Sequence, residues 1–124
     1  MKEIPFSSFY QAYQKGDLHV LDVREQEEYD ALHLDGVRLL PLSELADRYQ
    51  ELEKDHPYYV ICKSGRRSAR ACQFLEEQGY DVTNVQGGMD AFESFMKQKA
   101  EQEEAFNKRA EKYKGNRSQR RKKA

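Results

Sequence analysis

Short apolar runs alternate with amphipathic stretches along the first hundred residues of the chain. The runs at 4–6, 19–23, 36–40, 58–62 and 81–85 have the length of single β-strands. Between them lie stretches with helical spacing, clearest in the segment before the fourth run, where apolar residues recur every three or four positions. This alternation predicts an α/β fold with a sheet of about five mainly parallel strands and helices on both faces.

The first strand and the first helix carry their own boundary signals. Pro5 lacks the backbone N–H that a central strand needs, so we expect the strand at 4–6 to lie at an edge of the sheet. Ser7 or Ser8 is predicted to cap a helix that ends at Gly16.

The chain of 124 residues has the size of one folded domain. We place this domain over residues 1–100, because apolar positions become sparse beyond it. A helical extension is predicted over 101–114, and Gly115 with Asn116 is expected to end it. Residues 115–124 are predicted to be a basic, disordered tail, since their composition is polar and strongly charged.

The formal net charge of −1 conceals an asymmetry between the two ends of the chain. Residues 108–124 hold nine lysines and arginines against one acid, whereas residues 1–107 hold 12 basic and 21 acidic residues. The tail at 115–124 could therefore bind RNA, an acidic protein or an anionic lipid surface. It could equally be a solvated tail or contact the acidic part of the same chain. Tyr113 is the sole aromatic residue near it, which gives no support for stacking on bases.

Three features bear on compartment and cofactors. The N-terminal residues show no basic-then-apolar signal region, and no apolar stretch approaches the length of about 18 residues that a membrane span needs. The two cysteines, Cys62 and Cys72, are too few for a disulfide framework. The three histidines are scattered and have no cysteine pair at zinc-ligand spacing. We therefore expect a cytoplasmic protein with reduced thiols, no membrane span, and no metal or organic cofactor.

The candidate chemistry lies in the sequence Y-Y-V-I-C-K-S-G-R-R-S at 58–68. An apolar strand ends on Cys62, and ligand sites of parallel α/β sheets lie at that carboxyl edge. The loop from Lys63 to Arg67 is small and cationic, so its backbone N–H groups and its charges can surround an anion. A helix is expected to begin there with its N-terminal end facing the same point. These effects favour a thiolate and make Cys62 the candidate nucleophile.

Four sequence blocks in register resemble the single-domain rhodaneses, a family of sulfurtransferases. They are L-D-V-R-E-x-x-E-Y from Leu21, H-L-D-G-V from His33, C-K-S-G-R-R-S from Cys62 and V-x-G-G-x-x-A-F from Val85, within roughly residues 3–97. The resemblance implies a five-stranded, mostly parallel sheet between helices, in agreement with the pattern of strands and helices above.

The resemblance also implies roles for individual residues. Cys62 matches a nucleophile that carries sulfur as a persulfide, and the residues after it match the family's active-site loop: Lys63, Ser64, Gly65, Arg66 and Arg67. Lys63 and Arg67 are expected to attract an anionic sulfur donor, whereas Arg66 could point outward. Ser68 is expected to cap the following helix, with a hydrogen bond to the sulfur as its alternative role.

Other matching residues are expected to support the structure. Asp22 and Arg24 match a D-x-R that ends an early strand, and we expect a structural ion pair or a strand-end hydrogen bond there rather than an acid/base pair. Cys72 is taken as a buried helix residue rather than a resolving thiol. The chain departs from the family pattern in the second block, in the loop lysine, and in the aromatic residue after the glycine pair: Leu32, Asp35, Val37, Lys63 and Phe92.

The reaction implied by the resemblance has two half-reactions. The Cys62 thiolate takes the outer sulfur of thiosulfate, or the sulfane sulfur of a persulfide donor, and becomes a persulfide. A thiol or cyanide acceptor then removes that sulfur.

Two other functions stay open. A cysteine phosphatase or arsenate reductase can use the same fold, but phosphatases of this kind need five residues between cysteine and arginine, and four separate Cys62 from Arg67 here. The smaller loop favours sulfur, because a tetrahedral phosphate needs a wider ring and a bidentate arginine. The second alternative is a non-catalytic, partner-binding module, against which the intact cysteine and loop argue.

Overall fold

The computed structural model describes residues 1–123, with side chains described as far as Glu111. The chain divides into one compact unit over Met1–Phe92 and a second over Glu93–Ala124. The first unit holds the sheet and the candidate site, and the second consists of helix.

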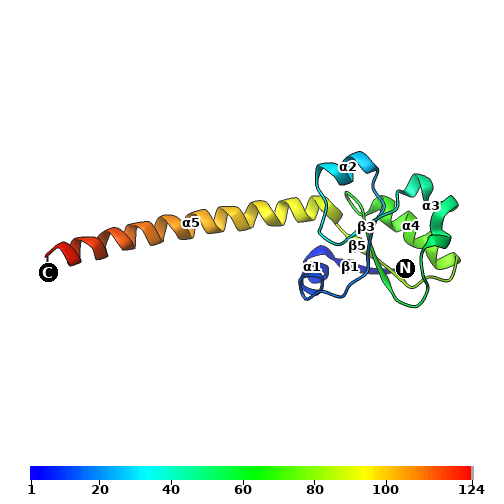
Figure 1. Cartoon of the computed structure of the whole chain (residues 1–124), viewed down its shortest axis with the longest axis horizontal. Coiled ribbons are helices and arrows are strands. Elements are labelled where there is room, and N and C mark those ends of the chain that lie inside the picture. The colour runs from blue at the N-terminus through cyan, green and yellow to red at the C-terminus, as the bar shows by residue number, and fades with distance from the viewer. Residues whose placement is uncertain (124) are drawn as a thin grey trace. The chain divides into compact units, whose positions relative to one another are not determined.

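Five parallel strands form the centre of the first unit: β1 (Lys2–Pro5), β2 (Val20–Asp22), β3 (Arg38–Leu39), β4 (Tyr58–Ile61) and β5 (Val82–Gln86). Their order in the sheet is β1-β5-β4-β2-β3, and every neighbouring pair is parallel. Figure 1 shows the sheet with the helices around it. The parallel sheet confirms the predicted α/β fold, and the edge position of β1 confirms the expectation from Pro5. β4 is the middle strand, so the residue that follows it lies at the centre of the carboxyl edge.

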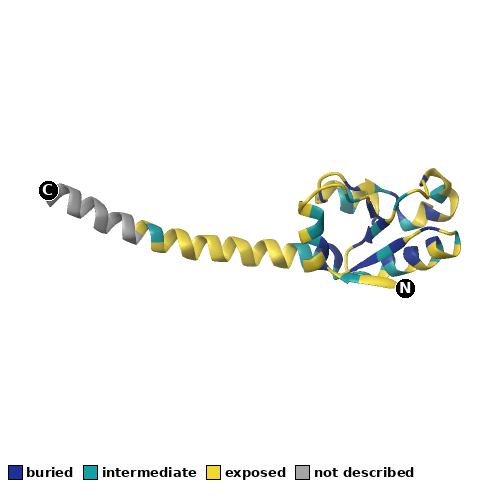
Figure 2. Ribbon diagram, turned by 90° about the horizontal axis from the view of Figure 1, so that it is seen from below, coloured by how far each residue is buried: buried dark blue, intermediate teal, exposed yellow. Residues whose placement is uncertain are grey.

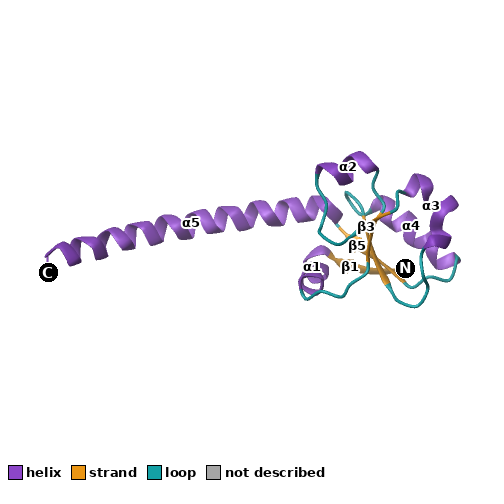
Figure 3. Cartoon of the chain, viewed as in Figure 1, coloured by secondary structure: helices purple, strands orange, loops and turns teal. Residues whose placement is uncertain are grey.

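Helices pack on both faces of the sheet (Figure 3). They are α1 (Phe6–Gln14), α2 (Gln26–Ala31), α3 (Leu42–Arg48), a single 3₁₀ turn (Tyr49–Glu51), α4 (Arg66–Glu77) and the start of α5 (Gly88–Lys123). Side chains of β4 alternate between two buried clusters, as strand geometry requires. Tyr58 and Val60 pack with residues of α3 and α4, whereas Tyr59 and Ile61 pack with residues of α1 and the first turn of α5. Figure 2 shows that the buried residues gather on the strands and on the helices around them.

The first helix begins earlier than the serine signal predicts. α1 starts at Phe6, and Pro5 occupies the N-cap position without a side-chain hydrogen bond, so the prediction of a Ser7 or Ser8 cap is wrong. Phe6 and Phe9 are both buried. Residues three apart lie on the same face of a helix, so a helix that begins at Phe6 directs both rings into the same core. Burial of two aromatic side chains outweighs a cap worth about 1 kcal/mol.

The C-terminal helix is longer than the sequence predicts. The backbone of α5 stays helical through Gly115 to Lys123, although the sequence predicts an end at Gly115. One glycine costs a helix about 1 kcal/mol, and most residues of 112–123 are lysine, arginine or glutamine, which are good helix formers. The predicted helix end at Gly115 is therefore wrong, whereas the domain boundary at residue 100 stays a prediction. The binding of RNA or an acidic protein by 115–124 falls on residues whose side chains are not described, and it also stays a prediction. No helix within 1–123 is long and apolar enough to cross a membrane.

The start of α5 packs directly against the chain that leaves β4. The backbone N–H of Met89 donates to the Cys62 carbonyl at 2.8 Å, and that of Asp90 donates to the Lys63 carbonyl at 2.9 Å. Gly88 has a φ of +52°, and a Cβ atom there would lie 2.2 Å from the Cys62 oxygen and 2.8 Å from the Lys63 oxygen. A side chain at this position would therefore displace the backbone that holds Cys62.

We expect Gly88→Ala to lower the free energy of unfolding by about 3 kcal/mol, because it combines a left-handed backbone with a clash against two carbonyls. Gly36→Ala is the matched control, since Gly36 has a φ of +79° but no atom near the position of a Cβ. It should cost about 1 kcal/mol. Urea denaturation of both variants tests this, and equal losses would show that the close approach at Gly88 does not matter.

Candidate active site

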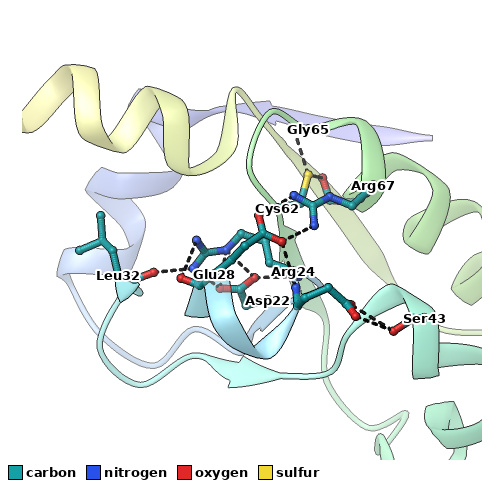
Figure 4. A network of polar contacts seen from close by, with 10 residues as sticks. Asp22, Arg24, Glu28, Leu32, Ser43, Cys62, Gly65 and Arg67 are labelled. Atoms are coloured by element: carbon teal, nitrogen blue, oxygen red, sulfur yellow. Dashed lines mark hydrogen bonds and ion pairs between the residues drawn. The ribbon is translucent and has the colours of Figure 1, made fainter. Parts of the chain in front are cut away.

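Cys62 directly follows β4 and is fully buried. Its Sγ accepts a hydrogen bond from the backbone N–H of Gly65 at 3.1 Å (Figure 4). α4 begins one residue later, with Gly65 in the N-cap position at a φ of +101°. The sulfur therefore lies beside the N-terminal end of a 12-residue helix, where the backbone dipoles favour negative charge.

Ser68 is buried on the first turn of α4 and does not cap it. Gly65 occupies the N-cap position and α4 has no side-chain cap hydrogen bond, so the predicted capping role of Ser68 is wrong. Gly65 takes that position because the tight turn after Cys62 needs a positive φ, which glycine adopts without strain. The Ser68 hydroxyl lies 3.3 Å from Cys62 Sγ instead, which is the alternative role considered for it.

Arg67 is held by a carboxylate that the sequence argument does not single out. Its two terminal nitrogens donate to Glu28 Oε1 and Oε2 at 2.6 and 2.8 Å, in a bidentate pair across 39 residues of sequence (Figure 4). The hydrogen bonds from Arg67 lower the pKa of Glu28 to about 2. The same bonds raise the pKa of Arg67. Much of the charge expected to attract an anionic donor is thus balanced within the protein.

A capping box could have drawn attention to Glu28. In α2 the Glu25 side chain accepts from the backbone N–H of Glu28, and the Glu28 side chain accepts from that of Glu25. The E-x-x-E spacing in the sequence resembles this motif only in part, because its N-cap residue is Glu25 in place of the usual serine or threonine. It orients Glu28 toward the helix start, although its partner Arg67 cannot be read from the spacing.

Asp22 and Arg24 form the predicted structural ion pair. Both side chains are buried, and the Arg24 guanidinium donates to both carboxylate oxygens at 2.8 to 3.1 Å. Arg24 also donates to the backbone carbonyls of Glu28 and Leu32, at 3.3 and 2.6 Å. The pair therefore fastens α2 to the end of β2 and makes no contact with the sulfur that would suit an acid or base.

The rest of the loop lies at the surface. Lys63, Ser64 and Arg66 are exposed, as expected for an outward Arg66. Lys63 Nζ forms an ion pair with Asp90 Oδ1 at 3.1 Å, in the first turn of α5. Two of the three loop cations are thus paired with acids that lie far from the loop in sequence.

Cys72 lies in the core between α4 and the sheet, as the sequence predicts. Burial raises the pKa of its thiol to about 12, so it stays protonated at neutral pH. A protonated, buried thiol is a poor nucleophile, which argues against a resolving role.

One cluster of metal-ligating side chains occurs within the described part of the chain, and it lies away from the sulfur. Glu53, Asp55 and His56 have ligand atoms within 4.8 Å of one another, just before the amino end of β4. Asp55 already pairs with His56 Nδ1 at 2.6 Å, and both carboxylates are exposed. This cluster has no geometric link to Cys62, which lies at the other end of the strand.

Comparison with known proteins places this arrangement in a family. The family model described as rhodanese-like domain matches residues 6–95. The chain belongs to the rhodanese-like domain family. A second family model, described as a family of unknown function, matches residues 79–124. The rhodanese-like match contains all the strands after β1 and the whole candidate site.

Relatives of this rhodanese-like domain include sulfur-handling proteins. YrkF of Bacillus subtilis, named as a candidate sulfur carrier, is 43% identical over 89 residues, which are 70% of this chain and 48% of YrkF. The thiosulfate sulfurtransferase GlpE of Pseudoalteromonas translucida is 32% identical over 81% of this chain and 96% of its own. A rhodanese-related protein of Thermoplasma volcanium has a solved structure with a TM-score of 0.71, at 33% identity over 76% of this chain and 92% of that one. The chain spans about half the length of YrkF.

The rhodanese-like domain should show a pH-dependent contribution from Glu28. Its pKa is about 2 in the folded protein and 4.5 ordinarily, so its ionised form stabilises the fold above pH 4.5, and this contribution is lost as pH falls toward 2. Because solvent screens the partly exposed pair, we expect Glu28→Gln to cost about 1 kcal/mol at pH 7. The difference from the wild type should shrink as pH falls below 4.5.

Urea denaturation at pH 7 and pH 3 measures this difference. Glu27→Gln is the matched control, because Glu27 lies on the same helix turn and is exposed. If Glu28→Gln lowers the free energy of unfolding by the same amount at both pH values, or by no more than Glu27→Gln does, the ionised Glu28–Arg67 pair does not stabilise the fold.

Proposed function

We propose that this domain is a sulfurtransferase in which Cys62 carries the transferred sulfur as a persulfide. The observation that carries the proposal is the position of Cys62 Sγ, at the carboxyl end of the central strand and 3.1 Å from the Gly65 N–H at the start of α4. An anionic sulfur there is stabilised by backbone donors and the helix end. The names of YrkF and GlpE, a candidate sulfur carrier and a thiosulfate sulfurtransferase, support this chemistry.

The first half-reaction loads the cysteine. The Cys62 thiolate attacks the outer sulfur of thiosulfate and forms a new S–S bond. The S–S bond of the donor breaks, and its electron pair leaves with sulfite. A persulfide donor would react in the same way and release a thiolate. The product is a Cys62 persulfide with its negative charge on the outer sulfur.

The second half-reaction delivers the sulfur. Cyanide or a thiolate attacks the outer sulfur, the S–S bond to Cys62 breaks, and its electron pair returns to Sγ. The cycle moves no net proton, so it needs hydrogen-bond donors rather than a general base. The Gly65 N–H donates to Sγ, and the Ser68 hydroxyl lies 3.3 Å from Sγ, where rotation of its hydrogen would make it a second donor.

The loop also fits the class of donor. Sγ itself is buried, whereas Lys63 and Arg66 are exposed beside it. A donor sulfur would reach Sγ through this loop, and exposed cations raise the local concentration of an anionic donor. Because Lys63 and Arg67 are each paired with an acid, the attraction is weaker than three free cations would give.

Wild-type protein incubated with thiosulfate should gain one sulfur atom in intact-mass spectrometry, and cyanide should then remove it. Cys62→Ala should gain none, because it lacks the nucleophile. Cys72→Ala is the matched control and should load like the wild type, since Cys72 is a buried, protonated thiol.

The proposal fails if the wild type gains no sulfur from either thiosulfate or glutathione persulfide. It also fails if Cys62→Ala loads as the wild type does.

A further inference from the structure

Two buried polar side chains, Ser68 and Asn84, are connected to Cys62 Sγ by consecutive polar contacts. Ser68 stands on the first turn of α4 and Asn84 on β5, and their exposed fractions are 0% and 2%. Ser68 Oγ lies 3.3 Å from Cys62 Sγ and 2.5 Å from Asn84 Oδ1. The reaction described above assigns no role to Asn84.

The orientation of the Asn84 amide follows from its other neighbours. Its Nδ2 donates to Glu3 Oε2 at 3.0 Å and to the Gly65 carbonyl at 3.3 Å. A carboxylate and a carbonyl can only accept, so a flipped amide would lose both bonds. Asn84 Oδ1 therefore faces Ser68, and the hydroxyl must be the donor between them.

The Ser68 hydroxyl has one hydrogen and two neighbours that can accept it. While that hydrogen is bonded to Asn84 Oδ1, Ser68 Oγ can only accept from Cys62, which requires a neutral S–H. A thiolate has no hydrogen to give and instead needs a donor. The hydroxyl meets that need by rotating its hydrogen from Asn84 to Sγ, at the cost of leaving Asn84 Oδ1 without it.

We propose that Ser68 passes its single hydrogen bond between Asn84 Oδ1 and Cys62 Sγ as the charge on the sulfur changes, and thereby stabilises Cys62 as the leaving group when sulfur is delivered. Ser68 touches the reacting sulfur. Asn84 is a positioning residue that acts through Ser68, and Glu3 fixes the orientation of its amide. This inference rests on the proposed function and extends it to the delivery step.

The hydrogen bond from the Ser68 hydroxyl to Cys62 Sγ would form in the delivery step, which it accelerates. In the persulfide the negative charge lies on the outer sulfur, and the Ser68 hydrogen stays with Asn84. As an acceptor attacks the outer sulfur, the S–S bond breaks and its electron pair collects on Sγ. The hydroxyl then donates to Sγ, so its stabilisation is larger in the transition state than in the persulfide.

Ser68→Ala should slow delivery more than loading. In single-turnover experiments on thiosulfate-loaded protein, we expect transfer of the sulfur to cyanide to slow about tenfold, the effect of losing one hydrogen bond to a charged group. Ser8→Ala, an exposed serine on α1, is the matched control and should deliver at the wild-type rate. Ser68→Thr retains the hydroxyl and should recover most of the rate, provided that circular dichroism shows it folded.

Substitutions at Ser68 and Asn84 should change the rate of Cys62 alkylation in opposite directions. The rate of Cys62 alkylation by iodoacetamide, measured at pH 7 in a Cys72→Ala background, should fall several-fold in Ser68→Ala because the thiolate loses a donor. It should rise in Asn84→Val, because the competing acceptor is gone and the hydroxyl always faces the sulfur. The double variant should match Ser68→Ala, because we infer that Asn84 acts on the sulfur through the hydroxyl rather than through its bond to the Gly65 carbonyl.

Together, the sulfur-loading, delivery and alkylation measurements distinguish a failure of the proposed sulfurtransferase function from a failure of the proposed role of Ser68. If the wild type never loads sulfur, the proposed function fails, and the alkylation rates alone decide the role of Ser68. If the wild type loads but Ser68→Ala delivers at the wild-type rate, the inference is overturned while the proposed function stands. Alkylation that falls equally in Ser68→Ala and Asn84→Val, with additive losses in the double variant, also overturns it, because purely structural damage gives that result.

Discussion

The buried ion pair between Asp22 and Arg24 is the interaction on which the rest of the site depends. A charge left unpaired at this depth would cost several kcal/mol, so the two side chains hold each other at the end of β2. Arg24 then binds two backbone carbonyls of the following segment and fixes α2. Glu28 on α2 forms an ion pair with Arg67, which lies on the first turn of α4 beside the sulfur of Cys62 (Figure 4).

The charges around the sulfur are mostly balanced within the protein. Arg67 is paired with Glu28 and Lys63 with Asp90, so the loop does not present a simple excess of cations. An anionic sulfur would be stabilised instead by two fixed dipoles, the Gly65 N–H and the N-terminal end of α4, and by the Ser68 hydroxyl once its hydrogen turns toward Sγ. Fixed dipoles in a buried site are screened by salt far less than exposed charges are. The loop cations therefore contribute less to the site than the sequence alone suggests.

The sequence predicted the features that local pattern controls. Apolar runs predicted the strands, Pro5 predicted the sheet edge, and an apolar strand that ends on Cys62 predicted where the sulfur lies. The missed partners are side chains brought together by the fold: Glu28 lies 39 residues from Arg67, and Asn84 lies 16 residues from Ser68. Asn84 did carry a signal, because it is a polar residue at a buried position of a strand. Its partner could not be found without the pairing of β5 beside β4.

A crystal structure of the thiosulfate-treated protein would show whether Cys62, at the start of α4, carries the sulfur. We expect electron density for one additional sulfur bonded to Cys62 Sγ, with the Gly65 N–H still directed at the site and Cys72 unchanged. Unmodified Cys62 in protein that has reacted with thiosulfate, or the added sulfur on Cys72, would contradict this expectation.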